Sequence, residues 1–159
     1  MRLNEHEYAI ELEWTGDQGA GTAGPRAYRR THIVRARGKL HDLHGSADRA
    51  FHGDRDRWNP EELLLAALAD CHMMSYLYAA ARRGVIVRGY ADSPTALLRQ
   101  NGQGGGAIVE AVLRPRVVMA DASMLEHAEA LHEEAAETCF INASVAFPVR
   151  HEPTVSLLT

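Results

Sequence analysis

The chain has 159 residues, a hydrophobic content of 46% and a formal net charge of −4 at pH 7. These values are typical of one soluble globular domain, so we expect a single domain over residues 1–159. The negative charge argues against a nucleic-acid-binding protein. A local stripe of arginines between Arg26 and Arg37 is interpreted as the solvated face of a strand.

The N-terminal segment, Met1 to Glu7, carries charges where a signal peptide would need an apolar core. We therefore expect a cytoplasmic, reducing location. The longest apolar stretch, Leu63 to Ala81, approaches the length of a membrane span but holds Asp70 and His72 near its middle, where ionisable groups are costly in lipid. We interpret it as the buried helix of a soluble protein that does not bind a membrane.

Strands are the first elements predicted along the chain. Residues Tyr8 to Trp14 alternate apolar and polar side chains, the period of a half-buried strand, and Tyr28 to Arg35 resume the alternation. Gly38-Lys39 is typical of a hairpin turn into Leu40 to His44. The polar stretch from Gly45 to Asn59 predicts a surface loop long enough to cover a site.

A long helix is predicted next. Asn59 and Pro60 suit the N-cap and the first helical position, and Glu61 and Glu62 complement the helix dipole in the first turn. The helix should end near Arg82 or Arg83, because basic residues there precede Gly84.

This helix is apolar on nearly every face. One stripe at helical spacing contains Cys71 among four other side chains, namely Leu64, Leu68, Ser75 and Tyr78. The few other helices and strands predicted in this chain cannot easily cover all faces of such a helix. We therefore expect an obligate homodimer that buries the helix against its symmetry mate.

The chain after this helix is predicted to contain more strands. Val85 to Tyr90, Thr95 to Arg99 and Ala107 to Met119 have strand composition and indicate a meander. A final strand is predicted over Ser144 to Val149, and Pro148 limits it to a sheet edge or to its own end.

A second helix is predicted between these strands. Ser123 and Glu126 match the spacing of a capping box, and the helix should end near Glu137. The order of strands, long helix, strands, helix and strand predicts an α+β fold.

The only two cysteines, Cys71 and Cys139, are 68 positions apart (139 − 71), and each adjoins a predicted helix. A cytoplasmic pair of this kind is redox-active, metal-binding or inert, and a permanent structural disulfide is not expected. His72 and His132 would complete a tetrahedral zinc site. The usual Cys-x-x-Cys and His-Glu-x-x-His spacings are absent from the sequence, so we expect no metal.

Several motifs occur in a fixed order from Tyr8 to Pro153. They include Tyr28-x-Arg30-x-His32, Asn59-Pro60-Glu61-Glu62, Cys71-His72-Met73, Cys139-Phe140-Ile141, Ser144-Val145 and Phe147-Pro148-Val149. With them the chain resembles the OsmC/Ohr family of thiol peroxidases, specifically its OsmC-like branch. The resemblance implies antiparallel sheets around a long central helix that bears a cysteine, in an intertwined homodimer with active sites at the subunit interface.

The resemblance also implies a cysteine-based peroxidase that reduces organic hydroperoxides to alcohols. Cys71 would be the peroxidatic thiol and Cys139 the resolving one, and the two would form a disulfide that an external dithiol reduces. The family's helix-start glutamate matches Glu61. Its activating arginine matches Arg30, with Arg26 in the same segment as the alternative.

No metal or organic cofactor is implied, and the substrate would contact apolar side chains, here Leu68, Met74 and Tyr78. The chain departs from the branch at Ala136, where members often carry a second histidine, and at Asp70, an acid beside the reactive cysteine. The alternative is a non-enzymatic dimeric binding or stress protein whose buried thiols are inert. Titration of the thiols before and after a stoichiometric organic hydroperoxide separates the two hypotheses.

Overall fold

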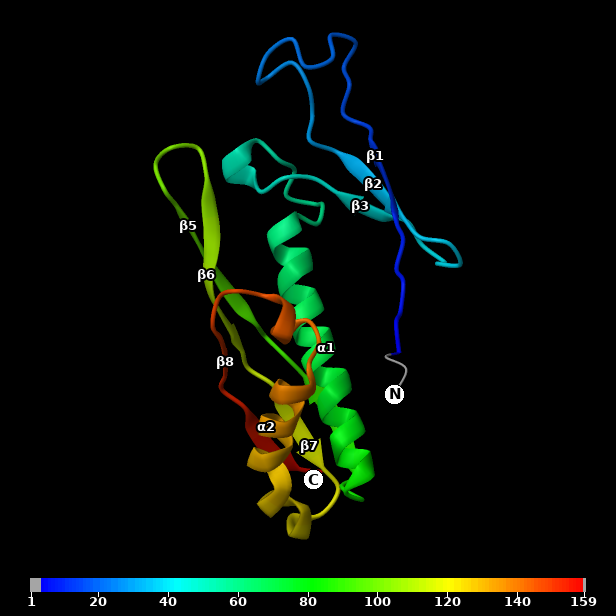
Figure 1. Ribbon diagram of the computed structural model, residues 1–159, viewed down its shortest axis with the longest axis vertical. Helices are drawn as coiled ribbons and strands as arrows, with labels where there is room; N and C mark the ends of the chain where they lie inside the picture. The colour runs from blue at the N-terminus through cyan, green and yellow to red at the C-terminus, as the bar shows by residue number, and fades with distance from the viewer. Residues whose placement is uncertain (1–3, 159) are drawn as a thin grey trace. The chain divides into compact units, whose positions relative to one another are not determined.

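A long helix, α1 (Pro60–Arg82), runs through the computed structural model, which describes residues 4–158 (Figure 1). Residues 1–3 of the segment in which we expected no signal peptide lie outside the described residues, as does residue 159. Contacts between residues divide the chain into two units, one up to Leu63 and one from Leu64 onward. The single domain over residues 1–159 stays a prediction.

The predicted bounds of α1 are confirmed. The side chain of Asn59 accepts a hydrogen bond of 2.8 Å from the Glu62 N–H, and the Asn59 N–H donates to the Glu62 carboxylate over 3.2 Å. This reciprocal pair satisfies two backbone donors at the start of the helix. At the other end Gly84 adopts a φ of +71°, a conformation that ends a helix at little cost in glycine.

The first unit contains a three-stranded antiparallel sheet in the order β1 (Glu11–Trp14), β2 (His32–Arg35), β3 (Leu43–Gly45). The three predicted strands are present but begin later than predicted, at Glu11, His32 and Leu43. The predicted turn at Gly38 is confirmed, and Gly38 has a φ of +80°. The prediction that the first strand is half-buried is wrong. All four β1 residues are exposed, and the Leu12 side chain is 64% exposed.

The second unit contains two three-stranded sheets, each with one antiparallel and one parallel pair. The first has the order β4-β7-β9 and the second the order β5-β6-β8. Their strands are β4 (Val87–Ala91), β5 (Thr95–Gln100), β6 (Gly106–Leu113), β7 (Arg116–Met119), β8 (Val149–His151) and β9 (Thr154–Leu157).

The predicted meander is wrong. The stretch that we predicted as one strand over Ala107 to Met119 is interrupted at Arg114-Pro115, and its halves β6 and β7 belong to different sheets. Pro115 has no N–H to donate to a ladder, which explains the break. As a result β4 pairs with β7 rather than with its neighbour β5.

The second helix, α2 (Ala128–Thr138), ends where predicted but begins differently. It follows a 3₁₀ turn, η2 (Ala122–His127), whose cap is Asp121. Ser123 is not a cap, because its N–H and its hydroxyl both donate to the Asp121 carboxylate, each over 2.8 Å. The predicted capping box at Ser123 is therefore wrong.

The strand predicted over Ser144 to Val149 begins later than expected, and an unpredicted strand, β9, follows it. Residues Asn142–Ser144 form a 3₁₀ turn, η3, and β8 begins only at Val149, directly after Pro148. Pro148 thus precedes the strand instead of ending it. The α+β class is confirmed.

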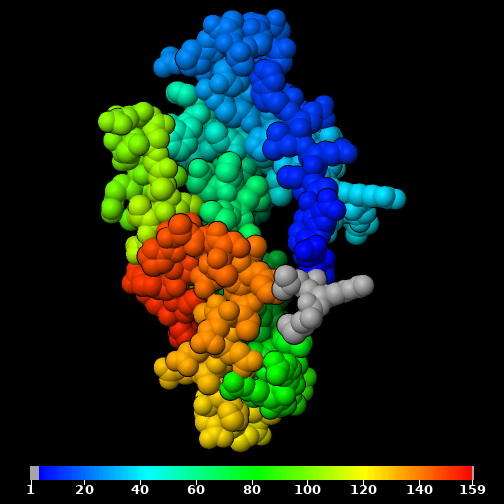
Figure 2. Space-filling model, viewed as in Figure 1, coloured from blue at the N-terminus to red at the C-terminus, as the bar shows by residue number. Residues whose placement is uncertain are grey.

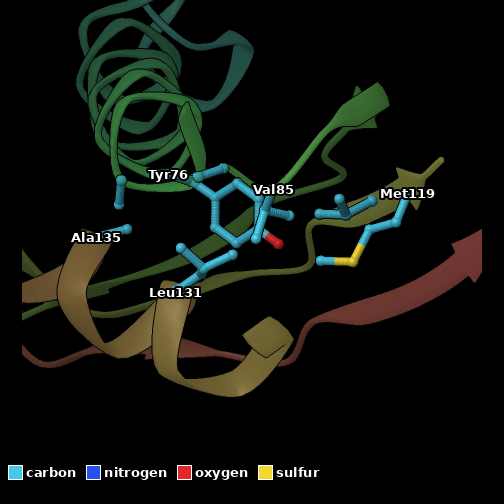
Figure 3. Packing of buried hydrophobic residues seen from close by; sticks show 8 residues of the cluster. Tyr76, Val85, Met119, Leu131 and Ala135 are labelled. Atoms are coloured by element: carbon cyan, nitrogen blue, oxygen red, sulfur yellow. The ribbon is translucent and has the colours of Figure 1, made fainter. Parts of the chain in front are cut away.

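The main core of the second unit lies where α1, α2 and β7 meet. Tyr76 projects from α1 toward Leu131 of α2, with Val85 and Met119 beside it (Figure 3). In Figure 1 α2 runs in the opposite direction to α1, and in Figure 2 the orange atoms of the α2 segment lie beside the green C-terminal end of α1. Burial of these apolar side chains stabilises the packing of α1 on α2 and β7.

The buried face of α1 differs from the predicted stripe. Its buried side chains are Leu68, His72, Tyr76, Ala79 and Ala80. Tyr78 from the predicted stripe is 67% exposed. By length and composition α1 would suffice to cross a membrane, a test that core helices of soluble proteins also pass, so the absence of membrane binding stays a prediction.

Candidate active site

Both cysteines line one pocket of the second unit. Cys71 lies near the middle of α1 and is half-buried, whereas Cys139 follows the last residue of α2 and is 1% exposed. The pocket has a volume of about 630 Å³. The antiparallel packing of α1 and α2 therefore brings together two thiols that are distant in sequence.

Apolar side chains surround the thiols. Met74 and Tyr78, which lie three and seven residues after Cys71 on α1, line the pocket together with Phe140 (74 − 71 and 78 − 71). The remaining lining residues are Ser75, Glu137, Thr138 and Ala143. Phe140 is 83% exposed, and such an aromatic side chain provides area for an apolar ligand.

Cys139 is a weak acid in this setting. Burial, together with the smaller effect of the hydrogen-bonding Cys71 side chain, raises the pKa of its thiol to about 11, while the Asn142 N–H, 3.3 Å from the sulfur, opposes the shift. The carbonyl end of α2 also disfavours a negative charge. Cys139 is therefore a protonated thiol at neutral pH.

Arg30 is held by its own loop in the first unit. Its guanidinium donates to the carbonyls of Tyr28 and Pro25 over 2.9 and 2.8 Å and lies 4.3 Å from the centre of the Tyr28 ring. Within residues 4–158 no ion pair includes Arg30. Arg26, the alternative, is exposed in the same loop.

Glu61 occupies the first turn of α1. One of its carboxylate oxygens, Oε2, is buried and has no hydrogen-bond partner in the described part of the chain. The structure thus brings Cys71, Cys139, Met74 and Tyr78 into one pocket but forms no ion pair between Glu61 and Arg30.

Leu68 lies elsewhere. It is 1% exposed and packs with Ala111 and Leu113 in a second core cluster, and it does not line the pocket. Phe140, which is not among the predicted site residues, also lines the pocket and directly follows Cys139 in the motif Cys139-Phe140-Ile141. Asp70, the acid next to Cys71, is exposed to solvent, so water screens its charge.

A cluster of histidines lies beside the site. His72 Nε2 is 3.1 Å from His132 Nδ1, and the His151 ring lies 4.3 Å from that of His72. Burial lowers the pKa of His72 to about 3 and that of His132 to about 4. Among residues 4–158 no group of three or more His, Cys, Asp or Glu side chains is arranged to hold a metal ion.

The α+β fold built around a long helix is that of OsmC-like proteins. The family model described as OsmC-like protein matches residues 52–154. The chain belongs to this family.

Solved structures share the fold. The chain is 30% identical, with a TM-score of 0.83, to an OsmC-like protein of unknown function from Vibrio cholerae, over 94% of this chain and 100% of that one. It also matches an organic hydroperoxide resistance protein from Elizabethkingia anophelis solved with thiocyanate bound, at 19% identity and a TM-score of 0.65, over 98% of this chain and 100% of that one. A third match, an organic hydroperoxide resistance protein from Legionella pneumophila, has 18% identity and a TM-score of 0.63 over 96% and 99% of the two chains. No curated protein matches the chain.

Proposed function

We propose that this protein is a thiol-dependent peroxidase that reduces organic hydroperoxides to alcohols. The observation that carries the proposal is that Cys71 and Cys139, the only cysteines of the sequence, line the same pocket. Membership of the OsmC-like family supports it, as do the structural neighbours named organic hydroperoxide resistance proteins.

The proposed cycle balances with these two thiols. The Cys71 thiolate attacks the distal oxygen of the hydroperoxide, the O–O bond breaks, and a proton converts the leaving alkoxide to the alcohol. The sulfur of Cys139 then attacks the Cys71 sulfenic acid, which forms the S–S bond and releases water. An external dithiol reduces the disulfide by exchange, so the cycle needs no metal or organic cofactor.

The environments of the two thiols support this division of roles. Cys139 is buried, and its raised pKa of about 11 keeps it protonated and unreactive toward peroxide at neutral pH. Cys71 is the more accessible of the two. A peroxide entering the pocket would therefore meet Cys71 as its nucleophile.

The lining of the pocket favours organic substrates. Met74, Tyr78 and Phe140 offer apolar surface beside the thiols. Burial of a substrate's alkyl or aryl group gains about 25 cal/mol for each Å² removed from water, a gain that hydrogen peroxide cannot obtain.

We further propose that Arg30 and Glu61 activate the thiolate of the other subunit in a homodimer. Since α1 is uninterrupted, the ten residues from Glu61 to Cys71 rise by about 15 Å at the usual 1.5 Å per residue. The Glu61 carboxylate is therefore too far along the helix to act at the Cys71 sulfur of its own chain. Within the second unit, Met74 of α1 is 55% exposed and Leu77 is 38% exposed, surface that a second copy would cover.

Replacement of each cysteine tests the proposal. The Cys71→Ser variant should have no turnover, whereas Cys139→Ser should consume about one equivalent of cumene hydroperoxide and stall as the sulfenic acid. Trapping with a sulfenic-acid reagent and mass spectrometry identifies that product. Full activity of Cys71→Ser would reject the proposal. If neither the two variants nor the wild type consumes peroxide, the result favours the alternative of inert thiols.

A further inference from the structure

We propose that His72 and His132 are positioning residues, whose hydrogen bond to each other sets the approach of Cys139 to Cys71. His72 directly follows Cys71 on α1, and His132 precedes Cys139 by seven residues (139 − 132), about two turns along α2. Two connections therefore join the same pair of segments. One is the imidazole pair and the other is the pair of thiols that line the pocket.

The imidazole pair is set firmly in the core. The side chains of His72 and His132 are 1% and 4% exposed. The Tyr76 ring lies 4.2 Å from the His132 ring, and the His151 ring lies 4.3 Å from the His72 ring. Neighbours on both sides thus restrict the imidazoles to one orientation, so a change in their separation moves the helices that carry them.

The bond between the two rings has no substitute nearby. Each neutral imidazole has one donor and one acceptor nitrogen, and here His72 Nε2 and His132 Nδ1 meet at 3.1 Å. The opposite nitrogens, His72 Nδ1 and His132 Nε2, are buried without a hydrogen-bond partner among the described residues. Loss of the mutual bond would leave both buried rings unpaired, which is costly.

The two rings use different nitrogens, and this asymmetry makes the inference testable. The side-chain amide of asparagine occupies the place of Nδ1 in histidine, whereas that of glutamine reaches the place of Nε2. His132→Asn and His72→Gln should therefore keep a hydrogen-bonding group at the contact. His132→Gln and His72→Asn place the same amide one methylene away from it.

The experiment measures how fast dibromobimane, which fluoresces when it bridges two thiols, links Cys71 to Cys139 in the full-length protein. We expect the bridging rates of His132→Asn and His72→Gln to lie within about threefold of wild type. The rates of His132→Gln and His72→Asn should fall about tenfold, as expected for the loss of one buried hydrogen bond. A purely structural role for a polar core group would not reverse the order of asparagine and glutamine between the two positions.

Val117→Ala is the control, because it removes apolar contacts of β7 in the core cluster that holds Tyr76 and Leu131 and leaves both histidines in the chain. Its bridging rate should equal that of wild type. Equal rates in all four histidine variants, or the same amide preferred at both positions, would overturn the inference.

This inference rests on the proposed function in one respect, namely that Cys71 and Cys139 react with each other. Peroxidase activity is therefore measured on the same samples. An inactive wild type with the expected order of bridging rates would reject the peroxidase and support the positioning pair. Histidine variants that keep peroxidase activity and bridge their thiols at the wild-type rate would support the peroxidase and reject the positioning pair.

Discussion

The backbone N–H of Asn142 lies 3.3 Å from the sulfur of Cys139 and donates a hydrogen bond to it. The Asn142 side chain in turn donates to the carbonyl of Ala136 over 3.1 Å, so the turn after α2 is tied back to the helix. The thiol is thereby oriented while burial keeps it protonated. Orientation without ionisation suits a resolving cysteine, which must wait for a sulfenic acid to form.

The pH dependence of alkylation tests this state of Cys139. In Cys71→Ser, where Cys139 is the only thiol, burial still raises its pKa, although the contribution of Cys71 is lost. Because only the thiolate reacts, the rate with iodoacetamide should rise about tenfold per pH unit from pH 7 to 9. Peptide mapping gives the rate, and a plateau below pH 8 would contradict the buried, protonated thiol.

The stability of the protein should fall in mild acid because of His72 and His132. Their folded-state pKa values of about 3 and about 4 lie below the ordinary 6.5, so the unfolded chain takes up protons that the folded chain excludes. Their contribution to stability is complete above pH 6.5 and is lost as the pH falls toward 4 and 3. Between pH 6.5 and 5 each should cost up to about 2 kcal/mol of unfolding free energy.

Urea unfolding at pH 7.5, 6 and 5 measures this loss. His132→Asn removes one of the two groups, so its unfolding free energy should depend less steeply on pH than that of wild type. The same slope in both proteins would show that other groups cause the acid sensitivity.

The start of α1 should depend on its capping pair. Asn59 is buried and exchanges two hydrogen bonds with Glu62, so Asn59→Ala should lower the unfolding free energy by about 1 kcal/mol. Asn59→Asp retains the acceptor and is the control, with an expected change of a few tenths of a kcal/mol. Thermal unfolding measures both variants, and equal melting temperatures for wild type and Asn59→Ala would show that the pair contributes nothing.

Phe140 should determine part of the preference for bulky peroxides. It lines the pocket, so Phe140→Ala should raise the KM for cumene hydroperoxide about tenfold and leave the rate with hydrogen peroxide unchanged. Leu97→Ala removes an equally apolar, exposed side chain of β5 that does not line the pocket and should change neither value. A parallel loss with both peroxides would assign Phe140 a structural role.

Mixed dimers test whether Glu61 serves the other subunit. They combine one Glu61→Ala chain with one Cys71→Ser chain. If Glu61 acts across the dimer, one site keeps both an intact Cys71 and an intact Glu61, and activity returns to about half of wild type. If it acts within its own chain, both sites are defective. No recovery in verified mixed dimers would reject the shared site.

Local signals in the sequence located α1 well. Asn59 and Pro60 at its start and Gly84 after its end act through short-range backbone geometry, which sequence alone reveals. Strand partners depend on long-range packing, so neither the pairing of β4 with β7 nor the division of β6 from β7 at Pro115 was predicted.

For the candidate site, the motifs around Cys71 and Cys139 identified the two thiols, but they did not predict which side chains surround them. A helix that is apolar on most faces gives little indication of which face is buried. Consequently Leu68 was expected in the pocket and lies in the core, while His72 and Tyr76 occupy the buried face instead of Ser75 and Tyr78. Phe140 lies in the turn after α2, where the sequence predicted neither a helix nor a strand.

The most direct test of the peroxidase proposal is the stoichiometry of thiol loss. Reduced protein is titrated with cumene hydroperoxide in the absence of any external dithiol, and the remaining thiols are counted with an alkylating reagent under denaturing conditions. The proposal predicts that one equivalent of hydroperoxide per chain removes both thiols, yields one equivalent of alcohol, and produces a Cys71–Cys139 disulfide that dithiothreitol reverses. Two alkylatable thiols per chain after excess hydroperoxide would contradict it.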